Sequence, residues 1–331
     1  MENFFKFKNL NVILFVLALC ILNACTKNDN NYIISGDSTN RVYVNTKTSY
    51  VNNYPLSILH TPISHVGNIT ATFPARCTQE TATDLIVTFA VDNSLVDVYN
   101  SAKSTTYSVV PDGLVVINNN GLTIPKGALV STDSVTISIS NDLLPQLTNS
   151  GYVIPVRISS ISNTSNTAIS SNQSIVYMVI TTSWTNCYNS SVVGDMVGTL
   201  ITPRTSWSAT LDATLVSGTL PQMFDGNTTT YWRINPIAFN LVVNLATQYT
   251  NITGIRTNSN STSYDLTQVQ VYSSTDGTTW VYQGTPTLSR ANVYQYIKFY
   301  SPITAKYLKI TAVTWYSTSR IYMAEFDVYK N

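Results

Sequence analysis

Short runs of β-branched and aromatic residues, separated by turn clusters, follow one another along most of this chain. Alternation is clearest at Val135-Thr136-Ile137-Ser138-Ile139, where every second residue is apolar, as in a strand with one buried face. Turn sequences such as Pro111-Asp112-Gly113 lie between the runs, and no stretch shows a sustained helical period. The pattern predicts an all-β chain, and the regular spacing of the first runs favours an immunoglobulin-like sandwich. The first runs span 41–46, 56–61, 68–73, 85–91, 107–110, 114–118, 134–140, 152–159 and 175–182.

The polarity of the chain comes from uncharged side chains. Charged residues make up 11% of the 331 residues, against about 25% in an average soluble protein. The net charge is +1, and no basic block is present, so nucleic acid is not an expected partner. No nucleophile elbow, phosphate-binding glycine loop or zinc motif occurs, and no pair of carboxylates stands out. We therefore expect a protein that is not an enzyme.

The first residues have the features of a targeting segment. Lys6 and Lys8 precede an apolar run over residues 12–22, which is short for a membrane span. The ending Leu22-Asn23-Ala24-Cys25 resembles a bacterial lipobox, which implies a lipoprotein signal peptide over 1–24, lipidation of Cys25 and a polar tether over 25–40. An ordinary signal peptide with an incidental cysteine is the alternative. With a lipid anchor, the protein would lie on the outer membrane or cell surface.

Two cysteines remain beyond the targeting segment, Cys77 and Cys187. Export permits a disulfide between them. They fall in what we expect to be different domains, which favours two separate thiols over a bridge.

Residues 41–183 resemble the domain of unknown function that follows the lipobox in many Bacteroidota surface lipoproteins. The resemblance is carried by Val96-Asp97-Val98-Tyr99-Asn100, Val110-Pro111-Asp112-Gly113, Ile124-Pro125-Lys126-Gly127 and Tyr152-Val153-Ile154-Pro155-Val156. It implies an immunoglobulin-like spacer without chemistry of its own.

Residues 184–331 resemble a discoidin, or coagulation factor 5/8 type C, domain and family 32 carbohydrate-binding modules. The matching stretches appear in family order: Trp207-Ser208-Ala209-Thr210, Phe224-Asp225-Gly226-Asn227, Val269-Gln270-Val271-Tyr272-Ser273, Thr275-Asp276-Gly277, Tyr307-Leu308-Lys309-Ile310 and Ala324-Glu325-Phe326-Asp327-Val328-Tyr329. The resemblance implies a jelly-roll β-sandwich. Trp232 and Trp280 adjoin apolar strand residues and are expected in its core.

A loop at Met223–Arg233 gathers oxygen ligands on a glycine bend. Asp225, Asn227 and Thr230 lie at close spacing there, as calcium ligands do. The family resemblance implies that Glu325 and the carbonyl of Ala324 complete a structural calcium site. A plain turn at residues 225–227, with Glu325 as a solvated edge charge, is the alternative.

Sugar recognition needs an exposed aromatic ring beside polar groups. Trp315 or Tyr316 is expected to stack on the sugar and Arg320 to donate hydrogen bonds, although one of the two rings could instead close the end of the sandwich. By resemblance, Arg233 occupies a site position where galactose-binding relatives often have histidine, which puts a preference for galactose in doubt. Asn258 and Asn260 fall in a loop where relatives carry polar ligand contacts.

Together these features predict a non-catalytic surface lipoprotein that binds a glycan or glycoconjugate. It would belong to a polysaccharide or host-glycan capture system, with glycan-uptake proteins as possible neighbours and the membrane reached through Cys25. The alternatives are an adhesin for protein or lipid head groups and an unrecognised glycoside hydrolase.

Overall fold

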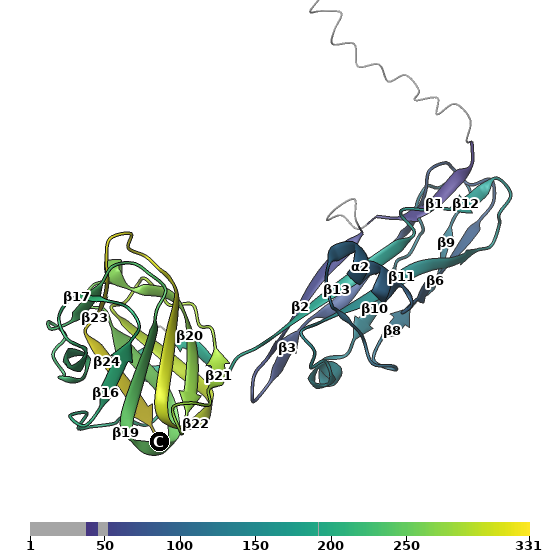
Figure 1. Cartoon of the computed structure of the whole chain (residues 1–331). Coiled ribbons are helices and arrows are strands. Elements are labelled where there is room, and N and C mark those ends of the chain that lie inside the picture. Colours follow the sequence, from purple (N-terminus) through teal and green to yellow (C-terminus); the bar gives the residue numbers. More distant parts are fainter. Residues whose placement is uncertain (1–37, 46–51, 191) are drawn as a thin grey trace, which may run out of the picture.

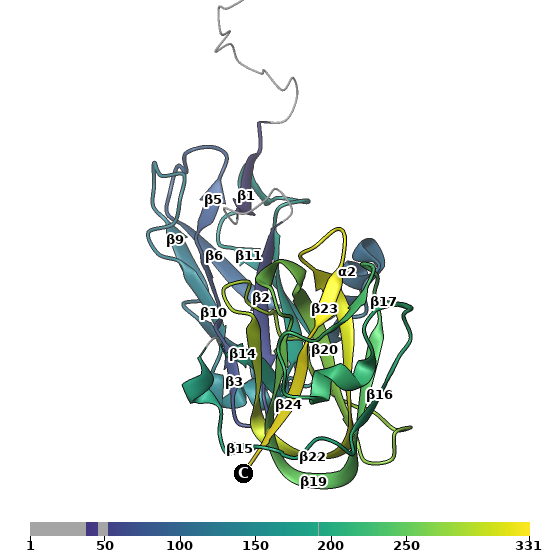
Figure 2. The ribbon, with the colours of Figure 1, turned by 90° about the vertical axis from the view of Figure 1, so that its left-hand side faces the viewer.

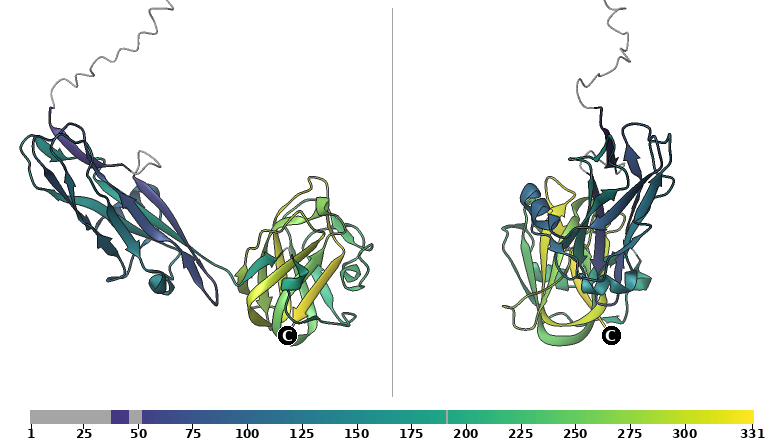
Figure 3. Two further views of the ribbon diagram at one scale, coloured as in Figure 1. Left: turned by 180° about the vertical axis from the view of Figure 1, so that it is seen from behind. Right: turned by 90° about the vertical axis from the view of Figure 1, so that its right-hand side faces the viewer.

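The computed structural model describes residues 38–45, 52–190 and 192–331. The expected signal peptide (1–24), the lipidation site Cys25 and most of the tether therefore lie outside the described residues. Two β-sandwich bodies are joined by a short connection (Figure 1), and the view from behind shows the same arrangement (Figure 3, left). Within the described ranges, no helix is long and apolar enough to cross a membrane. The prediction of an all-β chain with a sandwich in each half is confirmed.

The described residues of the N-terminal domain form three sheets, with strand orders β3-β2-β13-β11-β6-β9 (with β7 beside β11), β4-β10-β8 and β12-β1-β5. Apolar residues alternate inward along β1, β4 and β10, as in β10, where Val135, Ile137 and Ile139 are buried. The strands are β1 (Asn40–Val44), β2 (Asn53–His60), β3 (His65–Gly67), β4 (Ile69–Phe73), β5 (Ala75–Cys77), β6 (Leu85–Val91), β7 (Ser108–Val109), β8 (Val116–Asn118), β9 (Gly121–Ile124), β10 (Val135–Ile139), β11 (Gly151–Ile161), β12 (Thr167–Ile169) and β13 (Ile175–Trp184).

A short helix, α2 (Leu95–Lys103), contradicts the expectation of no helical stretch. Val96 and Tyr99, one turn apart, are buried by packing with Val153 of β11. The Asp92 carboxylate accepts hydrogen bonds from the backbone and hydroxyl of Ser94 just before the helix. Because the helix has only nine residues, Val96 and Tyr99 are its only pair of buried residues one turn apart. One pair is too short a pattern to indicate a helix in the sequence.

The C-terminal domain is a sandwich of one large sheet and one small sheet. The large sheet has the order β15-β24-β19-β22-β20-β21, with β14 paired to β22 and β16 to β19, and the small sheet has the order β17-β18-β23. Two long strands of the large sheet, β19 and β22, pair along most of their length, with register shifts between Asn244 and Gly254 of β19. The strands of the C-terminal domain are β14 (Cys187–Ser190), β15 (Thr199–Leu200), β16 (Ser208–Leu211), β17 (Leu215–Ser217), β18 (Trp232–Ile234), β19 (Asn240–Asn258), β20 (Leu266–Ser274), β21 (Val281–Gly284), β22 (Tyr294–Trp315), β23 (Ile321–Met323) and β24 (Glu325–Lys330).

The core of this domain confirms part of the tryptophan prediction. Trp232 is fully buried, with its ring 6.0 Å from that of Phe239 in a T-shaped arrangement. Trp280 was expected in the core, and that expectation is wrong. Its ring is half-buried, and the Lys309 ammonium lies 4.6 Å from its centroid. The Thr275-Asp276-Gly277 stretch that matches the family lies in the turn between β20 and β21, and Gly277 takes the left-handed φ of +79° that such a turn requires.

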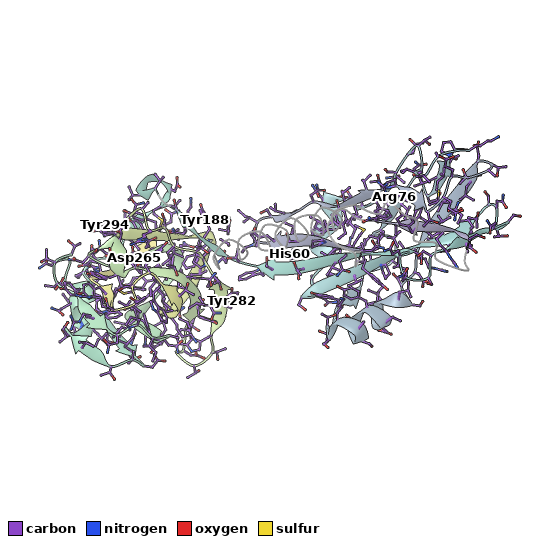
Figure 4. The ribbon with its side chains drawn as sticks, turned by 90° about the horizontal axis from the view of Figure 1, so that it is seen from above. His60, Arg76, Tyr188, Asp265, Tyr282 and Tyr294 are labelled. Carbon is purple, nitrogen blue, oxygen red and sulfur yellow. The ribbon has the colours of Figure 1, made fainter. Side chains whose placement is uncertain are left out.

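The chain passes between the domains immediately after β13. The backbone N–H of Thr185 donates to the carbonyl of His60 in the N-terminal domain, and that of Asn186 donates to the carbonyl of Gln283 in β21. Figure 4 shows His60 and Tyr282 on the facing ends of the two bodies. Cys77 and Cys187 are separate buried thiols, one in each domain.

Candidate functional site

The small sheet presents a polar face at one end of the C-terminal domain. Trp232 pairs with Met323 and Ile234 with Ile321, and all four side chains are buried. Between them, Arg233 pairs with Tyr322, and the period of two places these side chains on the opposite face. Figure 2 shows β17 and β23 at the end opposite the bends of β19 and β22, and Figure 1 shows them on the side away from the N-terminal domain.

Three tyrosines from separate segments meet on this face. The ring of Tyr231 stacks on that of Tyr322, with centroids 4.4 Å apart and an interplanar angle of 15°. Tyr264, from the short 3-10 helix Thr262–Tyr264, lies 4.3 Å from the same ring. Arg320 donates from Nη1 to the Tyr322 hydroxyl at 3.0 Å, and its guanidinium lies 5.2 Å from the centroid of Tyr264. We call Tyr231, Tyr264 and Tyr322, with Arg233 and Arg320, the tyrosine–arginine face.

Positive charge on this face changes the ionisation of Tyr322. Burial raises the pKa of its hydroxyl, but hydrogen bonds from Arg320 and Arg233 and the charges of both side chains outweigh burial, so the pKa falls below its ordinary value. The face therefore has a positive potential.

The two asparagines predicted to contact ligand have different positions. Asn260 is exposed, has a φ of +66°, and donates from Nδ2 to the carbonyl of Thr228 at 2.7 Å. It thereby ties its own loop to the 225–230 loop. Asn258 is 2% exposed, and its side chain accepts from the backbone N–H of Asn260. A ligand-contacting role for Asn258 is therefore wrong, because its amide is enclosed by the protein.

Trp315 and Tyr316, the two aromatic residues predicted to stack on a sugar, also have different positions. Trp315 is the last residue of β22 and packs, partly buried, against the core. The structure thus matches the alternative in which this ring closes the end of the sandwich. Tyr316 is exposed, and the guanidinium of Arg290 lies 5.1 Å from its ring centroid. Its backbone N–H donates to the carbonyl of Asp265.

Glu325, predicted as a calcium ligand, lies in a buried charge network. Its Oε2 accepts from Nη1 of Arg204 at 2.8 Å, and the same nitrogen contacts Asp327. The other carboxylate oxygen of Asp327 accepts from Arg256 at 2.7 Å. Both carboxylates are 2% exposed, so Glu325 is not the solvated edge charge of the alternative reading.

The residues of the 225–230 loop fit a hard cation. Thr230 Oγ1 lies 2.7 Å from Asp225 Oδ2 and 2.8 Å from the carbonyl oxygen of Asn227. Glu325 Oε1 is buried and has no partner, although such an oxygen usually has one. Burial raises the pKa of Glu325, Arg204 opposes this, and Asp327 and Asp225 add to it.

Charge also permits a divalent ion here. Three carboxylates, Asp225, Glu325 and Asp327, meet two guanidinium groups, which leaves one negative charge uncompensated. Within the described ranges, no cluster of three or more His, Cys, Asp or Glu side chains could hold a metal. A calcium ion would therefore be bound by the carboxylates of Asp225 and Glu325 together with neutral oxygens. One of these is the predicted carbonyl oxygen of Ala324, a residue that is fully buried.

Sequence reasoning missed the three tyrosines and Arg204. Tyr231 adjoins the predicted core residue Trp232, so strand alternation could have placed it on the surface beside Arg233. Tyr264 and Arg204 have no comparable signal, because their partners are distant along the chain: Arg204 meets Glu325 across 121 residues.

Comparison with known proteins agrees with these two domains. A family model described as an N-terminal domain matches residues 28–165, and the model of the F5/8 type C domain matches residues 205–326. No curated protein matches the chain.

One solved structure shows the same two-domain architecture. A two-domain protein of unknown function from Bacteroides fragilis is 18% identical, with a TM-score of 0.57 over 88% of this chain and 95% of that one. The family 32 carbohydrate-binding module of C. perfringens NanJ, solved in complex with galactose, is 21% identical. It covers 40% of this chain and 100% of its own, with a TM-score of 0.37. The chain thus joins a domain of the matched N-terminal family, over residues 28–165, to an F5/8 type C domain over residues 205–326.

Proposed function

We propose that this protein is a non-catalytic surface lipoprotein that binds glycans through its F5/8 type C domain. The tyrosine–arginine face carries the proposal. Aromatic faces suit the C–H surfaces of sugars, and guanidinium donors suit their oxygens. The face lies away from the N-terminal domain, which would act as a spacer above a lipid anchor at Cys25. Attachment to the outer membrane would place the site among glycan-uptake proteins.

The proposal of binding without catalysis is supported by the acidic side chains around the site, which are ion-paired or buried. Glu325 and Asp327 are held by arginines, and Asp265 is buried. A hydrolase of the usual type needs two carboxylates on either side of the scissile bond. The partly buried Trp315 also fits poorly with insertion of this loop into a lipid surface.

Affinity electrophoresis against a panel of polysaccharides and mucin glycans, with calcium present, tests the proposal. We expect Tyr264→Ala to weaken binding by about tenfold, which corresponds to 1.4 kcal/mol. Tyr272→Ala, which changes a half-buried tyrosine on β20, is the matched control and should bind normally. Retention on no glycan would refute the proposal, and co-sedimentation with liposomes instead would favour an adhesin for lipid head groups.

We also propose that a structural Ca²⁺ ion is held by Asp225, Asn227, Thr230, Glu325 and the carbonyl of Ala324. The ion would tie the 225–230 loop to the start of β24 and stiffen the end that carries the tyrosine–arginine face. Calcium at about 100 times its Kd should then stabilise the fold by roughly 2.7 kcal/mol, measured as a rise in Tm over an EDTA sample. The rise should disappear in Glu325→Gln. An equal rise in that variant would contradict the assignment.

A further inference from the structure

Three arginines of the C-terminal domain gather around the exposed loop at residues 316–320 and the neighbouring tyrosines. Arg320 belongs to this loop and lies over Tyr264. Arg290 comes from the segment before β22 and lies over Tyr316. Arg233 comes from β18, pairs with Tyr322 of β23, and helps to lower the pKa of the Tyr322 hydroxyl. Arg290 is exposed, and Arg233 and Arg320 are partly exposed.

These arginines differ from the other arginines of the same domain in having no carboxylate partner. Arg204 and Arg256 are held by buried carboxylates at 2.8 and 2.7 Å. In the part of the chain that the structure describes, Arg233, Arg290 and Arg320 form no ion pair. Their neighbours are phenol rings and hydroxyl groups, which orient a guanidinium without neutralising it.

The acidic side chain that follows Tyr264 in the chain carries less negative charge than a free carboxylate. Asp265 is 4% exposed, and burial raises its pKa to about 7, with Ser259 and Gln295 opposing the rise through hydrogen bonds. At slightly acidic pH its carboxyl is therefore mostly neutral. Arg320 uses one N–H group on Tyr322. A guanidinium stacked on a ring keeps its remaining N–H groups in one plane, where a planar or tetrahedral anion can accept two of them.

We propose that the glycan bound by the tyrosine–arginine face carries an acidic group, a sugar carboxylate or a sulfate ester, that is held by Arg233 and Arg320. Arg290 adds positive charge at the edge of the site. Neutral hydroxyls both donate and accept, so they need mixed partners. Three guanidinium groups without counter-charges offer donors alone and therefore select for an anion. This inference rests on the proposed glycan-binding function and names the class of glycan.

Isothermal titration of the full chain with two matched pairs of polysaccharides tests the proposal. Polygalacturonate against its methyl ester reports on the carboxylate, and κ-carrageenan against its desulfated form reports on the sulfate. We expect the acidic member of one pair to bind at least about tenfold more tightly than its neutral partner, and the pair that shows the difference identifies the anion. Affinity should fall as NaCl rises from 50 to 500 mM.

Three variants separate specific recognition from general attraction. Arg320→Gln and Arg233→Gln should each lose about tenfold in affinity for the acidic glycan. Lys309→Gln removes a cation that lies over Tyr272 and Trp280 instead, and it should bind within twofold of the parent. Equal loss in Lys309→Gln, or equal affinity for neutral and acidic members, would overturn the acidic-glycan proposal and leave glycan binding intact. Binding of no polysaccharide would overturn both.

Discussion

Asp265 should make the stability of the C-terminal domain depend on pH. Its carboxyl lies inside that domain (Figure 4), 4% exposed, and accepts a 3.2 Å hydrogen bond from Gln295. Burial raises its pKa from 3.8 to about 7, while Ser259 and Gln295 lower it. The perturbation is Asp265→Asn, which keeps the shape of the neutral carboxyl and removes its titration.

The size of the effect follows from the pKa difference. Because the folded state holds the Asp265 proton more tightly than the unfolded state, the contribution of this group to stability is greatest below pH 3.8. It decreases as pH rises and is lowest above pH 7. One pKa unit corresponds to about 1.4 kcal/mol, so the whole change is roughly 4 kcal/mol. Of this, roughly 3 kcal/mol falls between pH 5 and pH 8.

Urea unfolding followed by tryptophan fluorescence provides the assay, since all five tryptophans lie at or beyond residue 184. We expect the free energy of unfolding of Asp265→Asn, relative to the parent, to increase by up to roughly 3 kcal/mol from pH 5 to pH 8. Comparing the two proteins at each pH cancels the titration of other groups, such as Glu325. A difference that stays constant between pH 5 and pH 8 would refute the reasoning.

Three further outcomes follow from the structure. Arg204→Met should destabilise the C-terminal domain by about 3–5 kcal/mol in urea unfolding, because it leaves buried carboxylates unpaired. The control is Arg157→Met, which breaks a partly exposed ion pair with Asp92 in the other domain and should lower the free energy of unfolding by less than about 1 kcal/mol. If both variants lost the same stability, the argument that burial makes the Arg204 network important would be contradicted. Gly218→Ala should lower Tm, because Gly218 has a φ of +75° and an added Cβ would lie 2.2 Å from the carbonyl oxygen of Tyr231; an unchanged Tm would count against it. Cys187 should resist thiol labelling until unfolding, because burial raises its pKa to about 12, and rapid labelling of the folded chain would show otherwise.

Local sequence patterns determined the strands and turns. β6 spans residues 85–91, the bounds of its run of β-branched and aromatic residues, and Gly277 takes the left-handed φ of the turn between β20 and β21. Both depend on neighbouring residues, whose side-chain period and backbone preferences act over a few positions. The helix α2 was missed because its stability comes from packing on β11 and not from its own period.

Only the tertiary structure decided which side chains share the candidate site. Residues 223–233 already showed the oxygen ligands and Arg233 in the sequence. The stack of Tyr231 on Tyr322 depends on the register of β18 against β23, which joins residues about ninety positions apart. Other long-range contacts bury Asn258, place Trp315 at the edge of the core and bring Arg204 to Glu325. Burial and charge compensation arise from such contacts, so no local pattern in the chain records them.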